Sequence, residues 1–143
     1  LGASREFLDV YRDVGQQYKL PVMLNSDLIT QVSGTSFQQL EKENEIFIDR
    51  VYLGNFEDFE KGKLAAYYEK SIKSLNPGLN MILIHTAFDD PEMKSITKNH
   101  PNFGAAWRQI DFDFFSSLEC KTLLQEEGIE MITWKEIKKS IYA

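Results

Sequence analysis

The sequence predicts an α/β fold in which a parallel sheet is covered by outer helices. Amphipathic segments at helical spacing alternate along the 143 residues with short apolar runs, and such alternation favours parallel strands joined by helices. The clearest strand is the continuous apolar run Met81–Ile84, which follows an Asn-Pro-Gly turn and is short enough to be buried on both faces. About four strands are expected, too few to close a barrel but consistent with half of a (β/α)₈-like barrel. Because no internal repeat and no linker is present, residues 1–143 are expected to form a single domain.

The first part of the chain is expected to form a helix, a strand and a polar loop. Ser4 can cap a helix that ends near Lys19 and carries an apolar stripe, predicted to face the core, of Phe7, Leu8, Tyr11, Val14 and Tyr18. The apolar run Leu20–Leu24 is predicted to be a strand. Asn25, at its C-terminal end, fits either a loop or helix cap or the lining of a site. A turn at 33–36 and a short helix at 37–42 follow.

The middle of the chain is predicted to alternate strand, helix, strand and helix. Residues 45–53 form a β-rich stretch, which is broken by a Gly-Asn pair. Residues 57–75 form a helix that Gly62 weakens near its start, with a core stripe of Leu64, Tyr68, Ile72 and Leu75. After the Met81–Ile84 strand, Asp90 is predicted to be the N-cap of a helix with proline at its first position, ending near Lys98.

The last part of the chain is predicted to be mainly helical. A helix over 103–117 places Arg108 and Asp111 three residues apart, where the two side chains can pair. A capping box from Ser116 to Glu119 predicts a second helix, closed by Gly128 at the C′ position. The stretch Ile129–Thr133 is predicted to be a short strand. Thr133 and Glu136 form a second capping box, which begins a terminal helix that carries Ile137 and Ile141.

Composition excludes several classes of protein. The formal net charge is −6, which does not suit a nucleic-acid surface. No apolar run approaches the roughly 20 residues that span a bilayer, so no membrane partner is expected. The single cysteine, Cys120, excludes an internal disulfide and a cysteine-rich zinc site. The chain begins Leu-Gly-Ala rather than with Met, so it is expected to be a fragment or a processed product, and a cytoplasmic or a periplasmic or secreted location stays open.

His85 is the side chain that most invites a chemical interpretation. It ends the Met81–Ile84 strand, and Asp89 and Asp90 follow in the next loop, where α/β folds place their chemistry. The alternative is that His85 is a packed, hydrogen-bonded histidine with a structural role. The N-cap position is a sufficient structural explanation for Asp90. Asp89 has no such explanation and is therefore the freer carboxylate. No glycine-rich phosphate loop, dinucleotide fingerprint or His-Glu-x-x-His motif is present.

Three stretches carry a family resemblance. They are His-Thr-Ala-Phe-Asp-Asp-Pro-Glu at 85–92, Trp-Arg-Gln-x-Asp at 107–111, and Leu-Leu-x-Glu-x-Gly-Ile-x-x-Ile-Thr-Trp-x-x-Ile at 123–137. They resemble the YdjC-like carbohydrate deacetylases, the chitooligosaccharide deacetylase family. The opening helix and Leu20-Pro21-Val22 are similar to the segment after that family's paired metal-binding histidines. The resemblance covers nearly all of the chain and is most specific from Leu79 onward.

The resemblance implies a barrel-like fold and the removal of acetyl groups from N-acetylated sugars. Family members use a divalent metal, Zn²⁺ or Mg²⁺, held by an Asp and two His in N-terminal motifs. Those motifs are not found in this sequence. The chain is therefore expected to be the C-terminal portion of such a domain, inactive alone, without a tightly bound metal. A half-barrel also leaves apolar sheet edges exposed, which favours self-association into a homo-oligomer.

The same resemblance assigns roles to two residues. His85 is expected near the metal-bound water or the departing amine, and Arg108 is expected to order the acidic groups of the site. An N-acetylated oligosaccharide is the expected substrate. The other candidate site residues come from the sequence itself: Asp89 is the freer carboxylate after His85, Asn25 stands at a strand end, and Phe88 and Trp107 are aromatic side chains able to stack on sugar. None of these six residues is expected to be a metal ligand. Thr86 stands where proline is common, and the strand end at 23–25 lacks a frequent arginine. Both departures concern the substrate rather than the fold.

Two other functions remain open from the sequence. One is another metal-assisted hydrolase on a related barrel, such as a phosphoesterase. The acidic neighbours of His85 argue against a phosphate substrate, and only Arg108 favours one. The other is a catalytically inactive carbohydrate-binding domain, in which Trp107 and Phe88 would stack on sugar rings, although aromatic residues at helical spacing usually belong to a core.

Overall fold

The fold is mixed α/β and falls into two compact units. We describe it from a computed structural model, which covers residues 5–25, 45–100 and 102–142. The first unit contains residues 1–51, 78–80 and 131–143, and the second contains 52–77 and 81–130. In these described ranges, no helix has both the length and the apolar character needed to cross a membrane.

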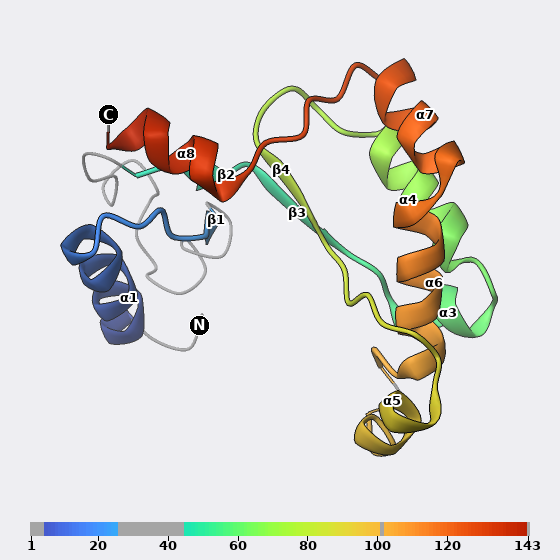
Figure 1. The fold of residues 1–143 in the computed structure, drawn as a ribbon. Coiled ribbons are helices and arrows are strands. Elements are labelled where there is room, and N and C mark those ends of the chain that lie inside the picture. The colour runs from blue at the N-terminus through green and yellow to red at the C-terminus, as the bar shows by residue number, and fades with distance from the viewer. Residues whose placement is uncertain (1–4, 26–44, 101, 143) are drawn as a thin grey trace. The chain divides into compact units, whose positions relative to one another are not determined.

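In its described residues, the first unit combines two helices with a small parallel sheet (Figure 1). Its elements are α1 (Arg5–Gln17), β1 (Leu24–Asn25), β2 (Phe47–Ile48) and α8 (Trp134–Ile141). β1 and β2 pair in parallel, with Leu24 opposite Phe47. Leu8 of α1 packs on Leu24, and Tyr11, Val22 and Phe47 surround them. Burial of these side chains is what holds α1 on the sheet.

The predicted helix of the first unit is confirmed, but three of the five residues of its predicted stripe are exposed. Leu8 and Tyr11 face the core, whereas Phe7, Val14 and Tyr18 are exposed, Tyr18 by 64%. The expectation that all of these faced the core is therefore wrong. Arg12 of α1 is also buried, and its guanidinium binds the Glu45 carboxylate through Nε (2.7 Å) and Nη2 (2.5 Å). The core of this unit thus includes a paired charge, which an apolar-periodicity argument does not detect.

Helix caps explain why one predicted strand does not form. Residues 129–133 are not a strand. The Ile129 N–H donates to the Leu124 carbonyl (2.9 Å), and the Thr133 N–H donates to the Glu136 carboxylate (2.7 Å). Both ends of the stretch are therefore used to cap helices. The predicted capping box of Thr133 and Glu136 is confirmed at the start of α8, and Ile137 is buried as expected.

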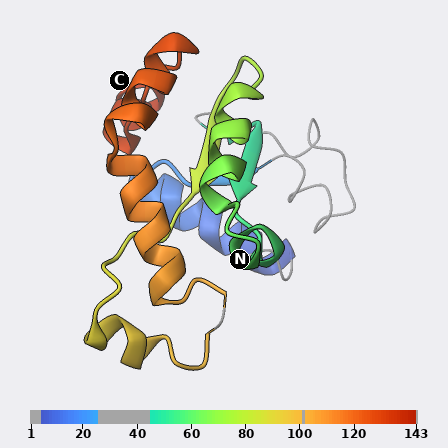
Figure 2. The ribbon, with the colours of Figure 1, turned by 90° about the vertical axis from the view of Figure 1, so that its right-hand side faces the viewer.

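The second unit is a helical layer next to a two-stranded sheet. β3 (Arg50–Leu53) pairs with β4 (Asn80–Leu83), and their first residues belong to the first unit. The helices are α3 (Phe56–Glu60), α4 (Leu64–Lys73), α5 (Pro91–Ile96), α6 (Ala105–Ser116) and α7 (Leu118–Glu126). Figures 1 and 2 show α6 and α7 following one another beside α4. Their shared core is built on Leu64, Tyr68 and Trp107, continued by Ile72, Cys120 and Leu123.

Two predicted elements are interrupted for local reasons. The predicted helix 57–75 is α3 and α4, separated at Gly62, which has a φ of 64°. The Gly62 and Lys63 N–H groups donate to the carbonyls of Phe59 (2.9 Å) and Asp58 (2.7 Å), which is a Schellman ending. The predicted strand 45–53 is interrupted at Asp49. The Asp49 N–H donates to the Leu79 carbonyl (2.8 Å), and the Asp49 carboxylate accepts the Leu79 N–H (2.7 Å).

The barrel-like part of the prediction is not confirmed. The described strands form two separate two-stranded sheets, and no closed barrel is present among them. The strand predicted at Met81–Ile84 is present as β4, one residue earlier, but its side chains are half-buried rather than buried on both faces. Ile84 lies just beyond β4 and is 36% exposed.

Candidate functional site

The connection that follows β4 is hydrogen-bonded along α6. The His85 N–H donates to Asp111 Oδ2 (2.7 Å), the Ala87 N–H to the Arg108 carbonyl (3.3 Å), and the Asp89 N–H to Gln109 Oε1 (2.8 Å). Every second residue from 85 to 89 therefore donates its backbone N–H to one helix. This places His85 and Asp89, both predicted site residues, on a segment whose course α6 defines.

Asp111 is the buried charged group of this region. It has no exposed surface, and its Oδ1 accepts the Tyr68 hydroxyl at 2.5 Å while Oδ2 accepts the His85 N–H. Burying a carboxylate is costly unless donors replace the lost water, and these two bonds supply them. Burial, and then the hydrogen bond to Asp111, raise the pKa of the Tyr68 hydroxyl far above its ordinary value. Tyr68 therefore stays protonated and donates.

The imidazole of His85 packs against a strained phenylalanine. The His85 ring is 4.2 Å from the Phe103 ring, centroid to centroid, and the Phe103 ring is 4.8 Å from that of Trp107. Phe103 has a φ of 62°, a conformation that costs a bulky residue about 1–3 kcal/mol. Arg108 Nε donates to the Phe103 carbonyl at 2.7 Å and so helps to hold this turn.

The predicted pairing of Arg108 with Asp111 is wrong. Although the two residues are three apart on α6, the guanidinium binds the Phe103 carbonyl, and both carboxylate oxygens of Asp111 are used by Tyr68 and His85. Arg108 is half-buried, whereas Asp111 is fully buried. Arg108 therefore touches the surroundings of His85 through Phe103 and not through an acidic group.

The acidic and aromatic residues after His85 are on the surface. Asp89 forms an ion pair with Lys94 (3.3 Å), and its side chain is about one-third exposed. Asp90 is the N-cap of α5, as predicted, and accepts the Met93 N–H at 2.8 Å. Phe88 is 61% exposed, with its ring 4.8 Å from that of Phe112. Asp89 and Phe88 are thus open to solvent.

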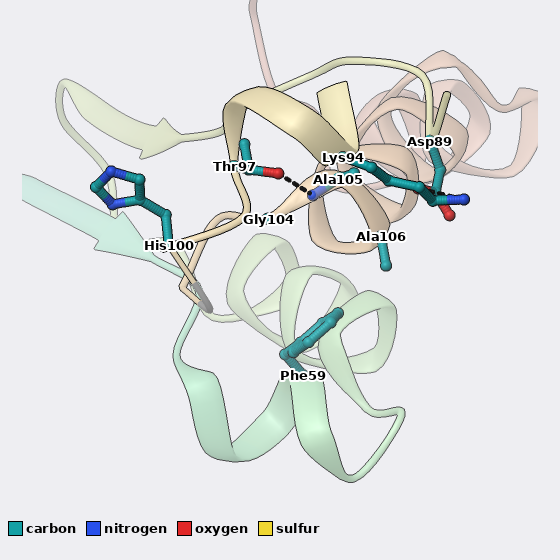
Figure 3. Close-up of a pocket in the computed structure, with 8 residues that line it drawn as sticks. All are labelled: Phe59, Asp89, Lys94, Thr97, His100, Gly104, Ala105 and Ala106. Atoms are coloured by element: carbon teal, nitrogen blue, oxygen red, sulfur yellow. Dashed lines mark hydrogen bonds and ion pairs between the residues drawn. The ribbon is translucent and has the colours of Figure 1, made fainter. Parts of the chain in front are cut away.

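An open pocket of about 290 Å³ lies beside Asp89. It is lined by Phe59, Asp89, Lys94, Thr97, His100, Gly104, Ala105 and Ala106 (Figure 3). The Thr97 hydroxyl accepts the Ala105 N–H (3.2 Å) at the start of α6. In Figure 3 the His100 ring and the Asp89 carboxylate point to opposite sides. His85 and Arg108 are not among the lining residues, so the structure brings Asp89, but not the other two predicted catalytic residues, to this pocket.

Two predicted substrate contacts lie elsewhere. Trp107 is 1% exposed, between the rings of Phe59 (5.3 Å) and Phe103, and packing assigns it to the core of the second unit. Asn25 belongs to the first unit, where its side-chain amide donates to the Ile48 carbonyl at 3.0 Å. Ser26 and Asp27, which follow it, lie outside the described residues.

The described residues do not fit a metal site on their own. Within ranges 5–25, 45–100 and 102–142, no three His, Cys, Asp or Glu side chains gather closely enough to hold a cation. The carboxylate nearest to His85 in the hydrogen-bond network, Asp111, already uses one oxygen for Tyr68 and the other for the His85 N–H. Neither oxygen is directed at an open position where an ion could bind.

Comparison with known proteins decides the family. A family model described as "YdjC-like protein" matches residues 3–126, which include β4, the connection after it and α6. The chain belongs to the YdjC-like family. A comparison with curated proteins finds no match. Membership in the YdjC-like family suggests a hydrolase of the carbohydrate-deacetylase type. It also confirms the resemblance inferred from residues 85–92 and 107–111.

Three residues around His85 were not identified from the sequence as part of the candidate site. They are Tyr68, Phe103 and Gln109, while Asp111 was assigned the wrong partner. A signal for Asp111 was present, because Trp107, Asp111 and Phe114 follow helical spacing and a carboxylate therefore occupies the buried stripe of α6. A charged residue at such a position requires buried donors. Nothing in the sequence indicates the left-handed conformation of Phe103.

Proposed function

We propose that the chain is part of a metal-dependent hydrolase that removes acetyl groups from N-acetylated sugars, in the manner of a chitooligosaccharide or polysaccharide deacetylase. The observation that carries the proposal is the YdjC-like family match across residues 3–126, which includes His85 at the end of β4. The structure supports it with two contacts of His85. Its backbone N–H donates to the buried Asp111 carboxylate, and its imidazole packs against the Phe103 ring. A fixed imidazole at a strand end is the kind of group that positioned proton transfer needs.

We assign His85 the role of proton donor to the departing amine. Hydrolysis of the acetamide adds a water oxygen to the carbonyl carbon and breaks the carbon–nitrogen bond, so that acetate and the sugar amine leave. The amine nitrogen requires a proton as that bond breaks, and an imidazole exchanges protons near neutral pH. In this assignment Arg108 acts indirectly, because it binds the carbonyl of Phe103, the residue that faces the imidazole.

Substrate contacts are proposed for the exposed residues of the same connection. Phe88 offers an exposed ring that can pack on the apolar face of a sugar. Asp89 can accept hydrogen bonds from sugar hydroxyls beside the pocket, in exchange for its exposed ion pair with Lys94, which is weak in water. Asn25, in the first unit, stays a sequence-based prediction. Trp107 is proposed to support Phe103 rather than to touch sugar.

The proposed reaction involves a divalent metal, Zn²⁺ or Mg²⁺, whose ligands we place outside the described residues. Such an ion supplies Lewis-acid polarisation of an amide carbonyl when it is bound. The residues described here do not form its site. We therefore expect calorimetric titration of residues 1–143 with Zn²⁺ to show no tight stoichiometric site. One tight site in this chain would contradict that expectation.

Acetate release from N-acetylglucosamine oligosaccharides tests the function. The full-length protein should release acetate, with added Zn²⁺ or Mg²⁺ restoring activity after treatment with a chelator. An aryl phosphate assayed in parallel tests the phosphoesterase alternative, and a binding measurement with the same oligosaccharides tests a non-catalytic sugar-binding role. Release of phosphate without acetate, or sugar binding without any turnover by folded, metal-supplemented protein, would refute the deacetylase assignment.

A further inference from the structure

The Asp111 carboxylate accepts the backbone N–H of His85, which lies beyond the end of β4. β4 ends at Leu83, so the His85 N–H lies two residues beyond the last strand residue. Its partner is Asp111 Oδ2 at 2.7 Å, from α6. A buried N–H without an acceptor is unfavourable, and a bond to a carboxylate is roughly twice as strong as a bond to a neutral acceptor. The position of the His85 backbone is therefore tied to the position of Asp111.

The Asp111 carboxylate is itself held from the opposite side. Its Oδ1 accepts the hydroxyl of Tyr68, a fully buried residue of α4. The Tyr68 ring packs on the rings of Phe114 (5.7 Å) and Phe115 (5.0 Å) of α6, so the hydroxyl has little freedom to leave. Tyr68, Asp111 and His85 thus form a chain of contacts from the core of the second unit to the strand end.

We propose that Asp111 is a positioning residue that fixes His85 through its backbone N–H, with Tyr68 fixing the Asp111 carboxylate. The proposal rests on the proposed function for its effect on turnover, since that effect exists only if His85 takes part in the reaction. Asp111 does not touch the imidazole in this arrangement. It sets the place from which the imidazole projects toward substrate, and a misplacement of about 1 Å at a reacting group can cost roughly 100-fold in rate.

Two substitutions of Asp111 separate positioning from general stabilisation. In Asp111→Asn the amide oxygen can accept the His85 N–H while the amide nitrogen donates to the Tyr68 oxygen, so both contacts survive. In Asp111→Ala both are lost. We expect the Asn variant to keep at least about one-third of kcat, and the Ala variant to lose about 10- to 100-fold in kcat with KM changed less than about threefold. Glu69→Gln, which removes an exposed carboxylate of α4, is the matched charge control.

A measurement independent of activity follows the His85 backbone directly. Amide NMR of the full chain compares Tyr68→Phe with Tyr67→Phe, which removes the neighbouring hydroxyl that donates to the Leu53 carbonyl. When the Asp111 carboxylate loses the Tyr68 donor, its bond to the His85 N–H strengthens. The His85 amide should then shift more than the other amides of residues 84–90. Tyr67→Phe should leave it in place.

These two readouts keep the positioning role distinct from the enzyme's identity. If the wild-type protein releases no acetate, the proposed function fails and the NMR comparison alone decides the role of Asp111. If Asp111→Ala does not fold, the Asn variant and Tyr68→Phe decide it. A shifted His85 amide in Tyr68→Phe together with a lowered kcat in folded Asp111→Ala is the expected result. An unmoved His85 amide in Tyr68→Phe, or wild-type kcat in folded Asp111→Ala, would overturn the proposal.

Discussion

Replacing Tyr68 by Phe removes a single buried hydroxyl and should destabilise the protein by about 2 kcal/mol at pH 7. The hydroxyl donates at 2.5 Å to a fully buried carboxylate, and hydrogen bonds to charged groups contribute roughly 1.5–3 kcal/mol. Phe retains the ring that packs on Phe114 and Phe115, so no cavity term is added. Tyr67→Phe removes a bond to a neutral carbonyl (2.9 Å) and should cost about 1 kcal/mol or less.

The loss from Tyr68→Phe should also depend on pH in one direction. Burial raises the pKa of Tyr68 above its ordinary value of 10.0, so the folded protein keeps a proton that the unfolded chain releases above pH 10. The stability that Tyr68 contributes is therefore complete below pH 10 and falls by about 1.4 kcal/mol for each pH unit above it. The Phe variant lacks this dependence. The difference in the free energy of unfolding between wild type and Tyr68→Phe should therefore become smaller as the pH rises above 10.

Urea unfolding at pH 7, 10 and 11 measures both effects on the same two proteins. Comparing wild type with variant at each pH cancels the titration of groups that they share. A difference of less than about 0.5 kcal/mol at pH 7 would refute the charged hydrogen bond, because that is the range of neutral surface changes. A difference that stays constant from pH 7 to pH 11 would refute the raised pKa of Tyr68.

Two further predictions concern packing and capping in the second unit. Gly54→Ala should lower the free energy of unfolding by about 1–3 kcal/mol, because a Cβ there would lie 2.7 Å from Leu64 Cδ1 and 2.8 Å from Trp107 Cζ2. An unchanged melting temperature would contradict this close packing. Ser117→Ala should lower the free energy of unfolding by about 1 kcal/mol, because it removes the N-cap hydroxyl that accepts the Cys120 N–H (3.0 Å). Ser116→Ala, the control, should lower it clearly less. Equal losses for the two variants in urea unfolding would contradict the assigned cap.

Local sequence signals predicted the helices well because each depends on a few neighbouring residues. Asp90 as N-cap, Gly128 as C′ residue and the box of Thr133 with Glu136 are all confirmed. The N-cap of α7 was predicted at Ser116, one residue too early. Ser116 and Ser117 are both good N-cap residues, and in the structure Ser117 is the cap. Such boundary differences are expected from adjacent equivalent residues.

Strands and site contacts were harder to predict because their partners are distant in sequence. Asp49 interrupts a predicted strand through a bond to Leu79, 30 residues away. His85 and Asp111 are 26 residues apart, and their contact is between a backbone N–H and a side chain, which residue types alone do not predict. The prediction placed His85 directly after a strand, and the structure has it two residues beyond the last residue of β4. The sequence did not indicate that the Asp111 carboxylate accepts the backbone N–H of His85.

Turnover by a His85→Ala variant tests the central claim most directly. The full-length protein and the variant should be compared for acetate release from N-acetylglucosamine oligosaccharides, with metal supplied and with equal folding shown by urea unfolding. A positioned general acid contributes typically 10²- to 10⁴-fold, so kcat should fall by at least about 100-fold while KM changes little. A variant that folds normally and keeps more than about half of the wild-type kcat would contradict the assignment of the chemistry to the end of β4.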